Sequence, residues 1–174
     1  MKLLLENWRQ YLNEKQGVTY FWQTRGPWKS ESQIEFGVTH VPKAKPFNMP
    51  IENIFEEVRK ANFSNRPSRL DCVYLCDNVK GWDGKSFCSY PASGDGETYQ
   101  VQLKGNPIVF KTNSELWTEA VFSFQRYEDE DRVRDYAYDY WEGDTEYGTF
   151  LEILVSPPES AIIVAKYEEE VPGI

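Results

Sequence analysis

The sequence is poor in the two residues that most often build metal and redox sites. His40 is the only histidine among 174 residues, which excludes a metal site made of two or more imidazoles. The three cysteines, Cys72, Cys76 and Cys88, are odd in number and show no C-x-x-C spacing, so neither a full disulfide framework nor a four-ligand zinc site follows. We therefore expect reduced thiols, a cytoplasmic protein and no bound metal.

Positive charge and long apolar runs are also scarce. The 19 Lys and Arg residues against 28 Asp and Glu residues give a net charge of −9, which disfavours nucleic acids and anionic membrane surfaces as partners. The leucines at positions 3–5 are followed at once by polar and charged residues, so this run is too short for a signal peptide or a membrane span. We expect a chain that is neither exported nor anchored.

Apolar and aromatic residues are abundant enough for one packed core. They make up 40% and 16% of the chain, and a length of 174 residues corresponds to a single domain. Leu4, Leu5, Trp8 and Leu12 recur at helical spacing, which predicts an amphipathic helix over residues 2–15. The predicted organisation is an N-terminal helical segment, 1–17, and a domain, 18–174. The helix either packs on that domain or docks on a partner.

Local patterns predict the remaining elements. Apolar spacing, Pro50, a Thr112/Glu115 capping box and the acidic start at Asp129 predict helices at 50–61, 112–125 and 129–142. Segments rich in β-branched and aromatic residues predict strands at 18–22, 33–41, 71–76, 99–103, 108–110, 149–155 and 160–166. The strands at 99–103 and 108–110 are expected to form a hairpin, and 77–97 to form a long loop. The predicted class is α+β, with two small, mainly antiparallel sheets flanked by about four helices.

Glu152 is the most informative single residue. It lies in the apolar run Phe150–Val155 and, in a regular strand, shares a face with Leu154. An unpaired carboxylate in an apolar environment costs several kcal/mol. Glu152 must therefore have a cationic partner, border a cleft, or lie on an edge strand or a solvent-facing side of the sheet.

Two other residues gain meaning from their order along the chain. Thr39-His40 ends an early predicted strand, Val73-Tyr74-Leu75-Cys76-Asp77 forms a later one, and Leu151-Glu152-Ile153-Leu154 lies in a late one. In this order the chain resembles the histidine–tyrosine–glutamate branch of the ADP-ribosyltransferase superfamily, which includes diphtheria-toxin-like and poly-ADP-ribose polymerase folds.

The resemblance implies a function and a set of roles. His40 would contact the adenosine ribose of NAD, Tyr74 would stack on nicotinamide, and Glu152 would bind the nicotinamide ribose. A carboxylate suits this reaction because it stabilises positive charge on the ribose, while an aromatic face positions the flat ring. The chain would transfer ADP-ribose from NAD to an acceptor that the sequence does not identify, with a host protein among the candidates.

Three residues before the Tyr74 strand are candidate ligands of the NAD pyrophosphate. Arg66, Ser68 and Arg69 lie in the loop that leads to this strand, and arginine forks match phosphate oxygens. Exposed arginines are common, so the alternative is that they are solvated loop charges.

Three short segments of the sequence also support a binding role in place of an enzymatic one. The opening Leu-Leu-Leu-Glu-Asn-Trp-Arg, the Pro-Ser-Arg before the Tyr74 strand and the Tyr140-Trp141-Glu142-Gly143 helix end are similar to those of small phage-encoded proteins. That similarity implies a phage protein in the host cytoplasm or the virion. The alternative function is therefore a catalytically inert module that uses the same fold, and its many Trp and Tyr residues, to bind a virion component or a host target.

Overall fold

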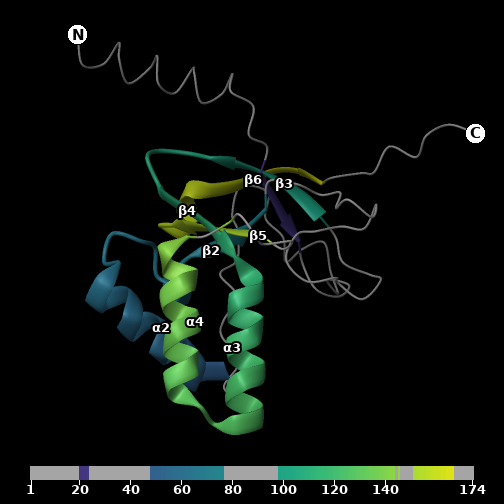
Figure 1. Cartoon of the computed structure of the whole chain (residues 1–174). Helices are drawn as coiled ribbons and strands as arrows, with labels where there is room; N and C mark the ends of the chain where they lie inside the picture. Colours follow the sequence, from purple (N-terminus) through teal and green to yellow (C-terminus); the bar gives the residue numbers. More distant parts are fainter. Residues whose placement is uncertain (1–19, 24–47, 77–97, 144, 146–150, 167–174) are drawn as a thin grey trace, which may run out of the picture.

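The computed structural model describes residues 20–23, 48–76, 98–143, 145 and 151–166. They form two antiparallel three-stranded sheets and three α-helices (Figure 1). One sheet has the order β1 (Tyr20–Gln23), β3 (Thr98–Leu103), β6 (Ala161–Lys166), and the other β2 (Val73–Leu75), β5 (Leu151–Ser156), β4 (Ile108–Asn113). The predicted α+β class is confirmed. The expected helix at 2–15, the strand at 33–41 and the loop at 77–97 lie outside the described residues.

The two sheets meet at an isolated bridge between Phe21 and Cys76. The Phe21 amide donates to the Cys76 carbonyl at 2.7 Å, and the Cys76 amide donates to the Phe21 carbonyl at 2.9 Å. The strands therefore follow one another in the order β4-β5-β2-β1-β3-β6.

The predicted hairpin between 99–103 and 108–110 is wrong. β3 pairs with β1 and β6, whereas β4 pairs with β5 in the other sheet. The four residues between β3 and β4 include Gly105 at φ +77°, and they carry the chain from one sheet to the other. A short glycine turn between two β-rich runs is typical of a hairpin. Here the two strands bury their side chains in different clusters, Tyr99 and Val101 between the sheets and Phe110 under the helices, so they pair in different sheets.

Each of the three described helices begins with a recognisable signal at its N-terminus. α2 (Met49–Asn62) has Pro50 in its first turn, as predicted. α3 (Ser114–Tyr127) is capped by Asn113, whose side-chain oxygen accepts from the Glu115 amide at 2.9 Å, so the expected Thr112 capping box is wrong. α4 (Glu130–Glu142) is capped by Asp129, as its acidic start predicts. No described helix is long and apolar enough to cross a membrane.

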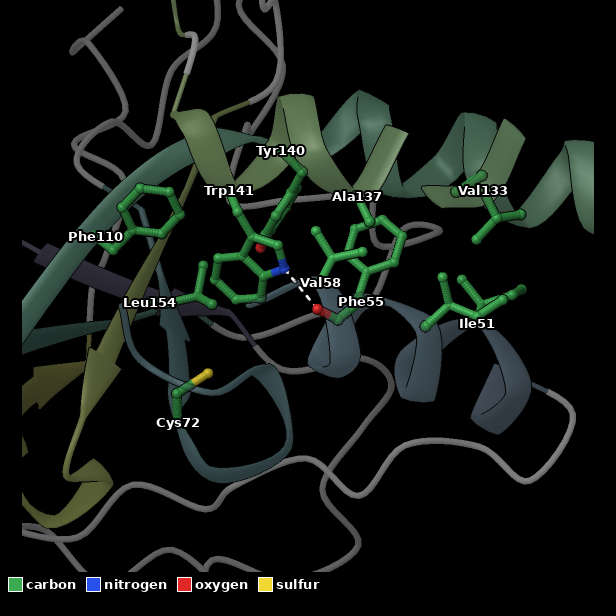
Figure 2. Packing of buried hydrophobic residues seen from close by; sticks show 12 residues of the cluster. Ile51, Phe55, Val58, Cys72, Phe110, Val133, Ala137, Tyr140, Trp141 and Leu154 are labelled. Carbon is green, nitrogen blue, oxygen red and sulfur yellow. Dashed lines mark hydrogen bonds between the residues drawn. The ribbon is translucent and has the colours of Figure 1, made fainter. Parts of the chain in front are cut away.

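The fold has a separate hydrophobic cluster on each face of the β2-β5-β4 sheet. Side chains alternate along β5, so Ile153 and Val155 join a cluster shared with the other sheet, while Leu154 joins the cluster under the helices. In the cluster under the helices, the Trp141 indole nitrogen donates a hydrogen bond to the Phe55 carbonyl at 2.8 Å and thereby links α4 to α2 (Figure 2). Helices α2, α3 and α4 thereby cover one face of this sheet (Figure 1).

Two cysteines lie among the described residues. Cys72 is free and fully buried in the helix-side cluster. Cys76 is disulfide-bonded, so the expectation of reduced thiols is wrong for this residue.

Candidate functional site

Glu152 lies on the helix side of β5, the middle strand of its sheet. It is 5% exposed, and its Oε1 accepts hydrogen bonds from Arg69 Nη1 at 2.7 Å and from the Tyr140 hydroxyl at 2.6 Å. The edge-strand and solvent-facing interpretations are therefore wrong. The cationic partner that the sequence called for is Arg69.

Arg69 lies at the centre of this buried network. It is the first residue of the short 3-10 helix η3 (Arg69–Asp71). Ser68 caps this helix, because its side-chain oxygen accepts a hydrogen bond from the Leu70 amide. The Arg69 guanidinium forks onto Glu52 in the first turn of α2, with Nε at 3.0 Å from Oε2 and Nη2 at 3.3 Å from Oε1. Arg69 thereby joins α2, η3 and β5.

Two tyrosine hydroxyls complete the polar contacts. Arg69 Nη1 donates to the Tyr140 hydroxyl at 2.5 Å, and that hydroxyl in turn donates to Glu152. The Tyr74 hydroxyl donates to the Arg69 carbonyl at 2.8 Å. Because Arg69 is only 8% exposed, the interpretation of Arg69 as a solvated loop charge is wrong.

Aromatic rings surround the guanidinium. Its central carbon lies 5.0 Å from the ring centre of Tyr140, 5.1 Å from Tyr74, 5.2 Å from Trp117 and 5.8 Å from Phe55. Each ring is within the range of cation–π attraction. We call the two carboxylates and these four rings the Arg69 cage. The indole nitrogen of Trp117 is buried and has no hydrogen-bond partner among the described residues.

Burial and charge fix the protonation states in the cage. Burial alone would lower the pKa of Arg69, but attraction to Glu52, the two tyrosines and Glu152 raises that pKa well above its ordinary value. Burial raises the pKa of Tyr140 and Tyr74 well above the usual range and the pKa of the neighbouring Cys72 to about 12. At neutral pH, Arg69 is thus a cation, both tyrosines are protonated, and Cys72 is a thiol and a poor nucleophile.

Ser68 and Arg66 follow α2 in the chain and contact two residues of that helix, Glu56 and Arg59. The Ser68 hydroxyl donates to Glu56 at 2.9 Å, and Arg59 forms two 2.8 Å hydrogen bonds to the same carboxylate. The Arg59 hydrogen bond, helped by that of Ser68, lowers the pKa of Glu56. The guanidinium of Arg66 lies 4.5 Å from the ring centre of Phe110, and its Nε is buried without a partner among the described residues.

The structure brings together some of the predicted site residues and not others. Tyr74, Glu152 and Arg69 meet in the cage, whereas Ser68 binds Glu56 and His40 lies outside the described residues. Sequence reasoning missed Glu52 and the hydroxyl of Tyr140. Glu52 lies beside the apolar face of the helix predicted at 50–61, and Tyr140 lies on the apolar face of the helix predicted at 129–142. A carboxylate next to one apolar face and a phenol hydroxyl on another were therefore the sequence features that could have indicated these two residues.

The described residues hold no group of three or more His, Cys, Asp and Glu side chains suited to a metal ion. A comparison with curated proteins finds no match to this sequence. A family model described as "Protein of unknown function (DUF2441)" matches residues 29–167, which is most of the chain. The chain therefore belongs to the DUF2441 family.

Proposed function

We propose that this chain is an NAD-dependent ADP-ribosyltransferase that releases nicotinamide. The observation that carries the proposal is the shared position of Tyr74 and Glu152. Tyr74 pairs with Leu154 across the neighbouring strands β2 and β5, and Glu152 is two residues along β5 on the same face. Both side chains lie on the helix side and contact Arg69. An aromatic ring and a carboxylate on the same face of neighbouring strands support the proposal, because the resemblance gives these two groups the nicotinamide and ribose contacts.

The chemistry of the reaction explains why these two groups belong together. The bond between the ribose C1′ and the nicotinamide nitrogen breaks, and nicotinamide leaves with the bonding electron pair. Positive charge develops on the ribose and is stabilised by a fixed carboxylate, while the aromatic ring orients nicotinamide. The acceptor nucleophile then bonds to C1′ and loses its proton.

The remaining roles follow from charge. The guanidinium of Arg69 is already paired with two carboxylates, so we assign it to holding Glu152 rather than to the pyrophosphate of NAD. Arg66, whose Nε has no hydrogen-bond partner among the described residues, is better suited to the phosphate oxygens. We keep His40 as the adenosine-ribose contact on the resemblance alone, and leave the acceptor as a host protein or another molecule.

The direct test compares nicotinamide release from NAD by the wild type and Glu152→Gln. Removing the carboxylate should reduce kcat by about 10²–10³-fold, the usual cost of losing one transition-state contact. Glu159→Gln is the matched control, since Glu159 is exposed just beyond the end of β5, and it should release nicotinamide at the wild-type rate. Circular dichroism checks that each variant is folded. A folded Glu152→Gln that keeps the wild-type rate would contradict the proposal.

A binding module without catalysis is the second candidate function. The observation that favours it is the closure of the network: Glu152 is buried, and its Oε1 is bonded to Arg69 and Tyr140, as in a purely structural ion cluster. On this alternative the chain acts as a phage protein on a virion component or a host target. The wild type would then neither bind NAD nor release nicotinamide, while Glu152→Gln would change only the free energy of unfolding.

A further inference from the structure

The Arg69 cage contains more negative than positive charge. Arg69 carries one formal positive charge, and Glu52 and Glu152 each carry one formal negative charge, which leaves a sum of −1. Both carboxylates share the one guanidinium, and the contact to Glu152, at 2.7 Å, is the shortest of their contacts. Glu52 takes two nitrogens of the guanidinium, at 3.0 and 3.3 Å, whereas Glu152 takes one nitrogen with one of its two oxygens.

We infer that Glu52 sets the charge of this site: because Glu52 and Glu152 share the single guanidinium of Arg69, the site has a net formal charge of −1 and selects a positively charged planar ring over its neutral counterpart. The inference rests on the proposed function, because the ring would be the cationic nicotinamide of NAD. It makes Glu52 a specificity-determining residue that acts through Arg69 and does not touch the reacting atoms.

The aromatic walls of the cage are where such a ring would be held. Tyr74 and Trp117 are only half-buried, whereas Glu52, Arg69 and Glu152 are buried beneath them. A flat cation lying against these rings would gain both cation–π attraction and the field of the surplus carboxylate. The indole N–H of Trp117, which is buried and has no hydrogen-bond partner within the described part of the chain, is a donor that the amide oxygen of a nicotinamide ring would satisfy on entering the cage.

The experiment uses two small probes of nearly equal shape, 1-methylnicotinamide, which is a cation, and nicotinamide, which is neutral. Their dissociation constants are measured by NMR titration on the wild type, Glu52→Gln and Glu57→Gln. Glu57 lies on the same helix but is exposed and pairs at the surface with Arg134, so Glu57→Gln is the matched control. Glu152→Gln is a second test variant, since it also brings the formal charge to zero.

The wild type and Glu57→Gln should bind the cation about tenfold more tightly than the neutral ring, the lower end of what a close, poorly solvated charge contributes. In Glu52→Gln and Glu152→Gln the preference should fall to within about twofold. If one of these variants does not fold, the other decides. Failure of the wild type to discriminate, or a preference that survives in a folded Glu52→Gln or Glu152→Gln, would overturn the inference.

Nicotinamide release from NAD, measured on the same preparations, separates this inference from the proposed function. A wild type that prefers the cation but releases no nicotinamide would leave the charge selection standing and remove the transferase reaction. A wild type that releases nicotinamide but binds both probes equally would support the reaction and refute the role of Glu52.

Discussion

Replacing Arg69 with methionine should be among the most destabilising single changes in the described part of the chain. The variant loses contacts of 2.5–3.3 Å to Glu52, Glu152 and Tyr140. Both carboxylates stay in a site where the residues are about 5% exposed, with no cation to balance them. Breaking a buried ion pair from one side costs about 3–5 kcal/mol, which for a chain of this length is a fall in Tm of roughly 6–20 °C.

The matched control for this prediction is Arg134→Met. Arg134 makes an ion pair of similar length, 2.9 Å to Glu57, but these side chains are 43% and 61% exposed. Solvent screens such a pair, so its loss should cost less than about 1 kcal/mol. Urea unfolding at pH 7 gives both free energies.

A triple variant separates charge imbalance from lost packing. Arg69→Met combined with Glu52→Gln and Glu152→Gln removes all three formal charges at once. Since the triple variant leaves no unbalanced charge in the buried site, it should recover part of the loss. A cost below about 1 kcal/mol for Arg69→Met alone, or no recovery in the triple variant, would show that Arg69 does not balance the two buried carboxylates.

Two further predictions concern the residues around the site. Gly143→Ala should destabilise the fold by about 1–2 kcal/mol, because Gly143 ends α4 at φ +87° and an added Cβ would lie 3.0 Å from the Phe110 ring; a thermal melt with no change in Tm would contradict this. Glu56 has its pKa lowered from 4.5 by Arg59 and Ser68, so its stabilisation is present above pH 4.5 and is lost as the pH falls through the lowered pKa. Between pH 7 and pH 3 the wild type should therefore lose more stability than Glu56→Gln, and parallel urea-unfolding profiles of the two proteins would contradict it.

Local patterns in the sequence were sufficient for the elements but not for their pairing. Pro50 and Asp129 predicted helix starts because first-turn proline and a carboxylate cap act within a few residues. The strand at 108–110 was also predicted, but its partner was not. The pairing of β4 with β5 depends on burying Phe110 and Thr112 under the helices, and no local turn signal reports that.

The site shows the same division between local and long-range information. The isolated carboxylate in β5 predicted that a cation would be needed, because that demand comes from desolvation alone. The identity of the cation did not follow, since Arg69 and Glu152 are 83 residues apart and Arg69 and Glu52 are 17 apart. The clustering of Tyr74, Tyr140 and Trp117 around Arg69 likewise depends on how the helices pack on the sheet.

A calorimetric titration of the wild-type protein with NAD at millimolar concentration shows directly whether this chain binds NAD. A site with a binding free energy of about −4 kcal/mol would be detected under these conditions. We expect saturable binding of NAD, together with nicotinamide release that Glu152→Gln slows by about 10²–10³-fold. The absence of any heat of binding, with the protein folded, would contradict the transferase proposal and leave the buried Arg69 network as a structural feature of a binding protein.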